Sequence, residues 1–559
     1  MVHQINPTET FRERQLALLR ENEYRRLARG RPAGRKPKAF LGLFAALVAV
    51  AIIMLVALSS PAHADGQFIF KVNFTGDLSD RNPGDLHCDV DFATGDTCTL
   101  RAAIQEANAT PETDIISFDI PEGFRDPTSG VATISPATRL PPITTPVLIN
   151  GYSQPGSSTN TLAVGDNAAI KVELDGSKVI TTTLVDGLRI VNSSSSMIRG
   201  LAINDFPGSG ISVSGDASSG PTIANDNLII GNFIGTDPSG KQDQGNLTDG
   251  VTVGSGAFGT TVGGTSPSER NLISGNHETG VSILSDSAGT RVQGNYIGTD
   301  KSGKADLGNQ GHGVLAAAPN NAIGGTTAGA GNVISGNNNS GVVVAETKNN
   351  DVLGNRIGTT ASGTGALGNS GAGVALQSAA GTSIGDGTRA GANTIAFNGG
   401  VLGFGGVEVL SSGSAGNSIL SNSIFSNTGL GINLVGGFED SSDATANDPG
   451  DIDSGANNLQ NKPAVSSAKT VSDKTTITGK LSSVPGQTYK VQFFSNPSAT
   501  NEGKKFIGQK SVTTNGSGTV SFTFSPVSKA AVGQTITATA TDPTNNTSEF
   551  SAPRTVAAS

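Results

Sequence analysis

The sequence predicts an all-β protein built mainly of a right-handed parallel β-helix, with one hydrophobic helix before it and a small β-sandwich after it. Three observations predict this fold class. A long block of sequence recurs at a nearly constant interval, and a short glycine motif recurs at about half that interval. The composition favours tight turns over helices, with 75 Gly, 4 Tyr and no Trp in 559 residues. Self-similarity at a fixed period is the sequence mark of stacked repeats.

The long repeat has three clear copies. They begin at Gly231, Gly294 and Gly354, and read Gly-Asn-Phe-Ile-Gly-Thr-Asp, Gly-Asn-Tyr-Ile-Gly-Thr-Asp and Gly-Asn-Arg-Ile-Gly-Thr-Thr. A second block follows the same interval, with Asn332-Val-Ile-Ser-Gly-Asn337 in the middle copy and counterparts that begin at Asn271 and Asn393. The repeat therefore extends over most of the chain between residues 227 and 433.

A Gly-apolar-x-apolar motif divides each long repeat into two coils. Its apolar positions alternate, as in Val251/Val253 and Val374/Leu376. Alternation with period two, bounded by glycine and asparagine, predicts short strands with one buried face. No segment between these strands is long enough for crossover helices, so parallel coils follow. We place the β-helix at residues 131–436. The motif begins at Gly187, Gly210, Gly250, Gly280, Gly313, Gly341, Gly373, Gly406 and Gly431.

Asparagines recur at fixed places in the coils, as at Asn276/Asn337 and Asn232/Asn295. Such residues resemble ligand sites. Stacked amides also satisfy the buried polar groups of turns, and we favour this structural interpretation.

The segment at residues 1–64 has the pattern of an export signal. Residues 1–38 carry ten Lys/Arg and four Glu, and residues 39–58 are a twenty-residue run without charge. At 1.5 Å per residue this run spans roughly 30 Å, the thickness of a hydrocarbon core. Ala62-His-Ala64 matches the small-x-small signal for cleavage. Residues 39–64 are thus a signal peptide or a retained signal-anchor helix, with residues 1–38 as a basic cytoplasmic segment. Both alternatives place residues 65–559 outside the cytoplasm, either secreted after cleavage near Ala64 or anchored at the cell surface.

Residues 65–130 are predicted to form an N-terminal cap. The chain's two cysteines, Cys88 and Cys98, lie here, and an even count in an oxidising compartment predicts a disulfide. A metal site with His87 is the weaker alternative, because the paired ligand spacing is missing. Thr99 starts a predicted helix at residues 99–109, with Leu100 and Ile104 on its apolar face.

Cys98-Thr-Leu-Arg-Ala-Ala resembles the C-S-L-R-E-A motif near the N-terminus of exported bacterial β-helix repeat proteins, and departs from it at Thr99 and Ala102. The resemblance extends to the Gly-Asn-x-Ile-Gly-Thr-Asp and Ile-Ser-Gly-Asn repeats, and covers essentially all of residues 65–559. It implies that the helix caps the first coil. It indicates the fold strongly and the activity weakly.

Residues 437–462 interrupt the repeat and are predicted to be an acidic linker. Asp448, Asp451 and Asp453 form an Asp-x-x-Asp-x-Asp pattern with flanking glycines, which could bring several hard oxygen ligands to calcium. The spacing is not that of an EF-hand loop. A solvated acidic turn is the alternative, and the commoner one.

Residues 463–559 alternate in the manner of antiparallel strands, with Asn515-Gly516 marking a hairpin. Six or seven short strands in just under a hundred residues predict an immunoglobulin-like sandwich. The closing segment at residues 541–550 resembles the last hairpin of bacterial Ig-like modules. Such modules usually space, anchor or help to attach a functional domain.

No catalytic residues are assigned from the sequence. Gly311-His-Gly313 matches one motif of polygalacturonases, but that family's other motifs are absent and His312 occupies a variable turn position. Asp237 and Asp300 share a repeat slot that holds Thr360 in the third copy. Glycoside hydrolysis requires two carboxyl groups about 5 to 10 Å apart, and the aligned strand positions offer few acids.

We expect an extracellular or cell-surface protein for binding or adhesion, with carbohydrate as the favoured ligand through family resemblance. The alternatives are a β-helix polysaccharide lyase or glycoside hydrolase, and a structural surface coat. With the overall charge of −9 and +6 in residues 1–38, the remaining chain carries −15, which disfavours nucleic acid. Calcium is the one cofactor considered. The membrane is a partner only if residues 39–58 are retained.

Overall fold

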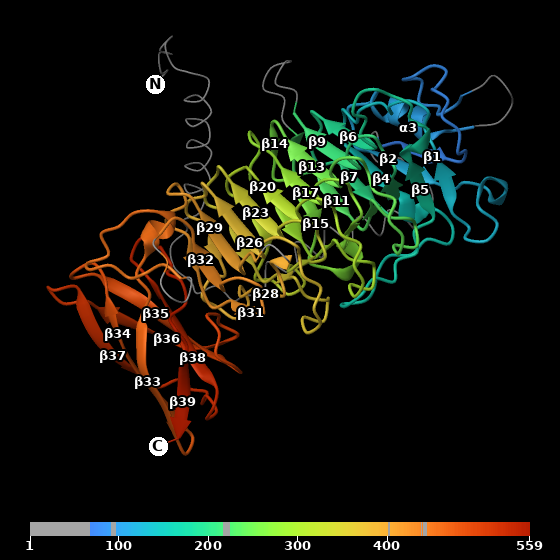
Figure 1. Cartoon of the computed structure of the whole chain (residues 1–559). Helices are drawn as coiled ribbons and strands as arrows, with labels where there is room; N and C mark the ends of the chain where they lie inside the picture. The colour runs from blue at the N-terminus through green and yellow to red at the C-terminus, as the bar shows by residue number, and fades with distance from the viewer. Residues whose placement is uncertain are drawn as a thin grey trace, which may run out of the picture. The chain divides into compact units, whose positions relative to one another are not determined.

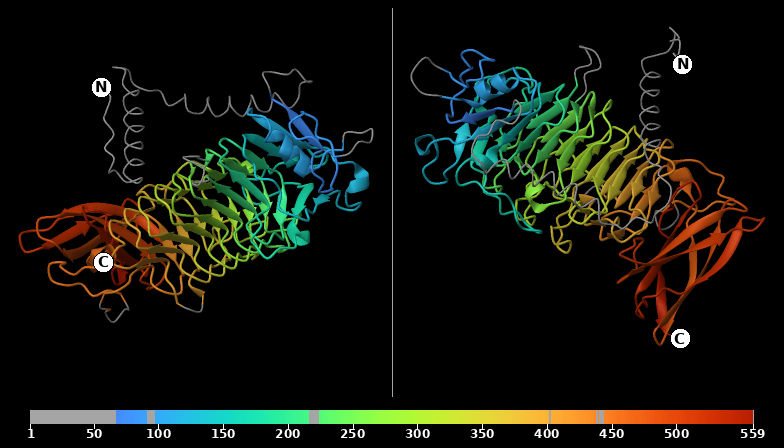
Figure 2. Two further views of the ribbon diagram at one scale, coloured as in Figure 1. Left: turned by 90° about the horizontal axis from the view of Figure 1, so that it is seen from above. Right: turned by 180° about the vertical axis from the view of Figure 1, so that it is seen from behind.

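The computed structural model describes residues 67–90, 97–215, 224–400, 403–437, 439 and 444–558. It confirms the predicted fold class. Three long parallel sheets wind around one apolar core, and their strands follow one another along a single axis (Figure 1, Figure 2). The described residues contain no helix long and apolar enough to span a membrane. The predicted export segment, residues 1–64, lies outside the described residues.

Each complete coil contributes one strand to each of three sheets; the sheets contain 11, 10 and 9 strands, because the first turns of the chain lack some of them. Sheet 1 contains β1 (Ile69–Val72), β2 (Asp114–Phe118), β4 (Val147–Asn150), β7 (Met197–Arg199), β11 (Leu228–Ile230), β15 (Thr261–Gly263), β18 (Arg291–Gln293), β21 (Ala322–Gly324), β24 (Asp351–Leu353), β27 (Ser383–Ile384) and β30 (Ser418–Ile419). Sheet 2 contains β3 (Ala132–Ile134), β5 (Val172–Asp175), β8 (Ala202–Asn204), β12 (Phe233–Ile234), β16 (Leu272–Ile273), β19 (Tyr296–Ile297), β22 (Val333–Ile334), β25 (Arg356–Ile357), β28 (Thr394–Ala396) and β31 (Ser423–Phe425).

Sheet 3 contains β6 (Leu188–Val191), β9 (Ile211–Ser214), β13 (Val251–Gly254), β17 (Val281–Ile283), β20 (Val314–Ala316), β23 (Val342–Ala345), β26 (Val374–Gln377), β29 (Val407–Leu410) and β32 (Ile432–Leu434). These are the strands that the Gly-apolar-x-apolar motif predicts. A two-stranded sheet of β10 (Ala224–Asn225) and β14 (Ala257–Phe258) and the 3-10 turns η1 (Glu122–Phe124), η2 (Gly151–Ser153), η3 (Gly176–Lys178), η5 (Pro267–Glu269) and η7 (Ala456–Leu459) lie between the main strands.

The core consists of β-branched and leucine side chains that stack in register. In sheet 3, Val251 pairs with Val281 and Val253 pairs with Ile283, and none of these side chains is exposed. Full burial of such a side chain contributes about 1.5 to 3 kcal/mol. Because the pattern repeats in each coil, neighbouring coils bury one another.

Two asparagine ladders run inside the corners, as predicted. One lies between sheets 1 and 2 and the other between sheets 2 and 3. In the second, the Oδ1 of Asn337 accepts from the backbone N–H of Asn309 at 3.3 Å and from its Nδ2 at 2.9 Å. Asn337 then donates in the same way to Asn369. The ladders comprise Asn232, Asn271, Asn295, Asn332, Asn355, Asn393 and Asn422, and Asn246, Asn276, Asn309, Asn337, Asn369, Asn398 and Asn427.

Longer loops leave sheet 2 in every second coil and stack on each other. The N–H of Lys301 donates to the carbonyl of Gly240 at 2.9 Å, and that of Ala361 to the carbonyl of Gly303 at 2.8 Å. These loops cover a second, smaller apolar cluster on the outer face of sheet 2. Its buried members are Ala168, Ile170, Ala202, Phe233, Leu272, Tyr296, Val333 and Ala361.

The N-terminal end of the core is covered by the helix α3 (Leu100–Ala107). Thr99 caps it by accepting from the N–H of Ala102 at 3.1 Å. The helix ends two residues before the predicted residue 109, because the N–H of Asn108 makes the last helical bond, to Ile104. Arg101 ties the helix to Asp77 of the preceding segment, 2.8 Å away, and to the carbonyl of Arg139 in the following one. Cys88 and Cys98 form a disulfide beside it.

The C-terminal domain is a seven-stranded sheet of order β36-β35-β38-β39-β33-β34-β37. Its strands are β33 (Ala464–Val471), β34 (Lys474–Ser482), β35 (Thr488–Asn496), β36 (Lys505–Thr513), β37 (Thr519–Phe524), β38 (Thr535–Thr541) and β39 (Arg554–Ala558). All pairs are antiparallel except β33–β39, and the strands enclose a core of their own. The likeness to an immunoglobulin-like module stays a prediction.

This domain packs directly against the end of the β-helix. Phe494 and Phe550 belong to the core of the β-helix and are exposed by 2% and 3%. Backbone N–H groups of the last coil donate to acceptors of the domain, such as that of Ile424 to the carbonyl of Gly503 at 3.0 Å. Part of the predicted linker is also buried, including Asn457, which continues a line of turn asparagines from Asn417.

Side chains of the domain complete this cover. Ile419 donates to Thr547, Ser421 to Gln492, Asn427 to Glu502 and Leu434 to Glu549. Each of these acceptors replaces the carbonyl or amide oxygen that a further coil would provide. The C-terminal domain therefore covers the end of the β-helix and is not a separate module joined to it by a linker alone.

Candidate functional site

The repeated aspartates Asp237 and Asp300 organise their own loops. The Oδ1 of Asp237 accepts from the N–H groups of Lys241 and Gln242, both at 2.9 Å, and Asp300 does the same one repeat later. Burial alone would raise the pKa of Asp237, but the hydrogen bonds from Ser239, Lys241 and Gln242 outweigh it and hold that pKa below its ordinary value. Carboxylates held in this way stabilise turns and are poor proton donors.

His312 lies in a turn before sheet 3, where the sequence placed it. Burial lowers the pKa of its imidazole, so the ring is neutral near pH 7, and its Nδ1 has no hydrogen-bond partner. Its neighbours in the same turn of adjacent coils are Thr279 and Ser340. Among the described residues, the hydrogen bonds give His312 no carboxylate or hydroxyl partner for catalysis.

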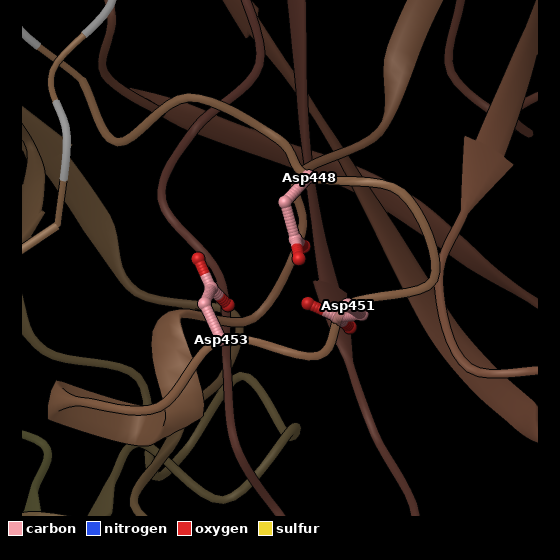
Figure 3. A group of neighbouring side chains, drawn as sticks. All are labelled: Asp448, Asp451 and Asp453. Atoms are coloured by element: carbon pink, nitrogen blue, oxygen red, sulfur yellow. The ribbon is translucent and has the colours of Figure 1, made fainter.

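Asp448, Asp451 and Asp453 converge as the sequence pattern suggested. One oxygen from each lies within 4.8 Å of the others, and the three side chains point toward one another (Figure 3). All three are partly buried. The Oδ1 of Asp453 is buried without a hydrogen-bond donor. This donor set of hard oxygens fits the ligand preference of calcium.

Asp451 also has a structural role in this group. Its Oδ1 accepts from the N–H of Asn461 at 2.9 Å, and its Oδ2 from Gln460 at 2.7 Å and from the hydroxyl of Ser483. Burial, helped by the negative charges of Asp448 and Asp453, raises the pKa of Asp451 to about 6 against these hydrogen bonds. The Oδ2 of Asp451 thus holds the segment onto Ser483 of the C-terminal domain and its Oδ1 binds the segment's own Asn461, which leaves Asp448 and Asp453 as the better ligands.

A second group of carboxyl groups, which sequence reasoning missed, lies where successive coils leave sheet 2. We name Glu173, Asp175, Asp205 and Asp243 the acidic row. Thr133 donates to Glu173 at 2.7 Å, Ser135 donates to Asp175 at 2.9 Å, and the N–H of Gly245 donates to Asp243 at 3.0 Å. Among the ion pairs of the described residues, none includes a member of the row.

Asp205 is the perturbed member of the row. Burial raises the pKa of its carboxyl group, and the negative charges of Asp175, Glu173 and Asp243 raise it further, while His277 opposes them. The backbone at Asp205 has a positive φ of 55°, which turns the chain sharply after β8. A carboxyl group of raised pKa beside ionised carboxylates can act as a general acid or accept hydrogen bonds from hydroxyl groups.

Asn204 joins the row from the strand before it. Its side chain is fully buried, and its Nδ2 donates to Glu173 at 3.1 Å and to Gln244 at 3.3 Å. Its Oδ1 has no donor. Asn204 therefore helps to fix the orientation of Glu173, while its own unpaired oxygen is buried and out of reach of a ligand.

One sequence signal could have identified part of this row. Asp243 occupies the same place in its loop as Asp306 one repeat later, and both close a bridge to a threonine of the Ile-Gly-Thr motif. The third copy has Ala366 there. Asp205 carries no such signal, because its coil precedes the regular repeats.

No family model matches this chain, and no curated protein matches it. Among solved structures, the chain is similar to the A-module of the mannuronan C-5 epimerase AlgE6 of Azotobacter vinelandii, with 15% identity over 62% of this chain and 86% of that one, and a TM-score of 0.36.

Two further structures belong to other proteins. The periplasmic alginate epimerase AlgG has 11% identity over 60% of this chain and 80% of its own, with a TM-score of 0.35. Tailspike protein 2 of the Escherichia coli O157:H7 bacteriophage CAB120 has 10% identity over 86% of this chain and 68% of its own, with a TM-score of 0.32.

Proposed function

We propose that this chain is an extracellular or cell-surface protein whose β-helix binds carbohydrate. The observation that carries the proposal is the acidic row, whose four carboxyl-bearing residues are exposed or partly exposed and form no ion pair among the described residues. Carboxylates form strong, charge-assisted hydrogen bonds with hydroxyl donors, and a polysaccharide supplies such donors at regular intervals. A rigid rod that repeats its coils can add many weak contacts of this kind.

The surroundings of the row favour this ligand class over nucleic acid. Phosphate recognition requires clusters of basic side chains, whereas the row consists of acids without ion-pair partners among the described residues. The extracellular location rests on the export pattern of residues 1–64 and on the disulfide between Cys88 and Cys98, which suits an oxidising compartment.

A glycoside hydrolase is the second candidate, and the same row favours it. Asp205 would be the general acid, because its pKa is raised by burial and by its acidic neighbours. Glu173 or Asp175 would be the second carboxyl group that hydrolysis of a glycosidic bond requires. A coat that assembles end to end is disfavoured, because the C-terminal domain occupies the end of the β-helix.

Calcium at Asp448, Asp451 and Asp453 stays a proposal beside this function. It would join the last coil to the C-terminal domain, since Asp451 already contacts Ser483. Calcium bound there would mainly stabilise the folded protein and would affect ligand binding only indirectly. Thermal unfolding with calcium and with a chelator tests it, and equal midpoints would contradict it.

The decisive experiment incubates the full-length chain with immobilised neutral, amino-sugar and uronate polysaccharides, with and without calcium. Retention is measured together with the release of reducing ends. The variant Asp205→Asn removes the carboxyl group with little change of shape. Asp351→Asn is its matched control, since Asp351 is an exposed aspartate on β24 of sheet 1.

We expect retention by the wild-type protein and by Asp351→Asn, weaker retention by Asp205→Asn, and no new reducing ends. If the wild-type protein releases reducing ends and Asp205→Asn does not, the chain is a glycoside hydrolase and not a binding protein. Failure to retain any polysaccharide would overturn the proposed function.

A further inference from the structure

A polar cleft lies where the last coils of the β-helix meet the C-terminal domain. Its volume is about 610 Å³, within the range of roughly 300 to 1,000 Å³ that small-molecule pockets have. One wall consists of turn residues of the β-helix, including Thr428, together with Asn433 of β32. The other wall is the loop at residues 499–501 that follows β35, and Glu439 also lines the cleft. Junctions between domains are a common place for ligand sites.

Asn433 is held in a fixed orientation in this cleft. Its Nδ2 donates to the Oε2 of Glu408 at 2.9 Å, and the Oε1 of Glu408 accepts from the N–H of Gly405 at 2.6 Å. Glu408 is exposed by only 5%. Since a carboxylate accepts and never donates, the amide nitrogen of Asn433 must face Glu408. Asn433 therefore presents its Oδ1, an acceptor, to the cleft.

The charges around the cleft select the class of ligand. Its lining residues include Glu439 and Glu502, and none of those that the structure describes is Lys or Arg. An anionic ligand would meet like charge, with no basic side chain among the described lining residues. The remaining polar groups include the hydroxyl-bearing side chains of Thr428 and Thr500. The lining thus suits a ligand that is uncharged and rich in hydroxyl groups.

We propose that the cleft binds the end of a neutral oligosaccharide chain. The inference rests on the proposed function and adds to it a site beside the last coils, whereas the acidic row lies among the first ones. The sugar hydroxyls would donate to the Oδ1 of Asn433 and exchange hydrogen bonds with the two threonines. A chain of uronate residues would be rejected through its carboxylates.

The test uses two variants that fill the cleft from opposite walls, Thr428→Trp and Thr500→Trp, in the full-length chain. Thr364→Trp is the matched control, because Thr364 is an exposed loop residue that does not line the cleft. The chain has no tryptophan of its own, so each introduced indole is also a unique fluorescent reporter. The probes are neutral trisaccharides of glucose, mannose and N-acetylglucosamine, and the trisaccharide of mannuronate.

We expect at least one neutral trisaccharide to bind the wild-type protein, with an affinity at least tenfold lower for both cleft variants and unchanged for Thr364→Trp. Mannuronate should not bind. Wild-type affinity and unaltered indole emission in both cleft variants would overturn the inference, as would a preference for mannuronate. If the cleft does not bind trisaccharides but immobilised polysaccharides still retain the wild-type protein better than Asp205→Asn, only this inference fails and the proposed function stands. If no glycan binds the wild-type protein, both proposals fall.

Discussion

Replacement of one rung of an asparagine ladder should destabilise the whole protein. Asn337 is fully buried, and its Oδ1 accepts from the backbone N–H and from the Nδ2 of Asn309. In Asn337→Ala both donors lose their acceptor inside the corner. A buried donor without a partner costs about 1 to 3 kcal/mol. Two of them give a loss of about 2 to 6 kcal/mol in the free energy of unfolding.

The adjacent residue supplies the control. Asn338 is exposed in the same turn, so Asn338→Ala should change the free energy of unfolding by no more than about 0.5 kcal/mol. Urea denaturation followed by circular dichroism measures both variants, and hydrogen exchange at Asn309 locates the effect. Asn309 should lose protection in Asn337→Ala alone. Equal stabilities of the two variants would refute the view that the ladders hold the coils together.

Three further predictions concern the two ends of the β-helix and the aspartate group. Glu502→Ala should lower the free energy of unfolding by about 1 to 3 kcal/mol and speed hydrogen exchange in the last coil, because Glu502 accepts hydrogen bonds from the N–H groups of Ser426 and Asn427. Unchanged protection of Asn427 from exchange would contradict this prediction. Glu278→Ala, at an exposed turn, is the control. In the presence of a chelator, the pKa of about 6 at Asp451, raised from 3.8, should give this carboxyl group a stabilising contribution that is complete below about pH 4 and is lost as the pH rises through 6, because the folded state binds the proton more tightly. Thermal unfolding midpoints measured at several pH values check this prediction. Asp451→Asn should reduce the dependence of the midpoint on pH. An unchanged dependence in that variant would show that Asp451 does not cause it. Replacement of both Cys88 and Cys98 by serine should lower the free energy of unfolding by about 3 kcal/mol, because the disulfide restricts the unfolded chain by closing a loop whose ends are 10 residues apart. Equal denaturation midpoints of the wild-type protein and this variant would contradict the prediction.

The coils could be predicted from the sequence because their causes are local and repeated. Val251 and Val253 alternate with polar residues, a glycine precedes them, and the same pattern returns in the next coil, so one strand identifies its neighbours. The asparagine ladders followed from the same regularity. Nothing in that reasoning required knowledge of contacts between unlike segments.

The acidic row and the closed end depend on contacts that no period reveals. Asp205 lies beside Asp175 and Asp243 only because turns of different lengths bring their coils into register. Glu502 and Thr547 come from different parts of the C-terminal domain, and Glu502 binds the turn after β31 whereas Thr547 binds β30. A single sequence shows alternation within a segment, but it does not show which segments meet.

The loops that stack in every second coil make the pair of coils the unit in which this rod can change its length. Removal of a single coil would set a long loop against a short turn and separate Gly240 from Lys301 or Gly303 from Ala361. Removal of one full repeat, from β19 through β24 with their loops, would again place a long loop on a long loop and a short turn on a short turn. Shortened or lengthened versions of this protein should therefore fold in steps of two coils, with the C-terminal domain always placed after the last one.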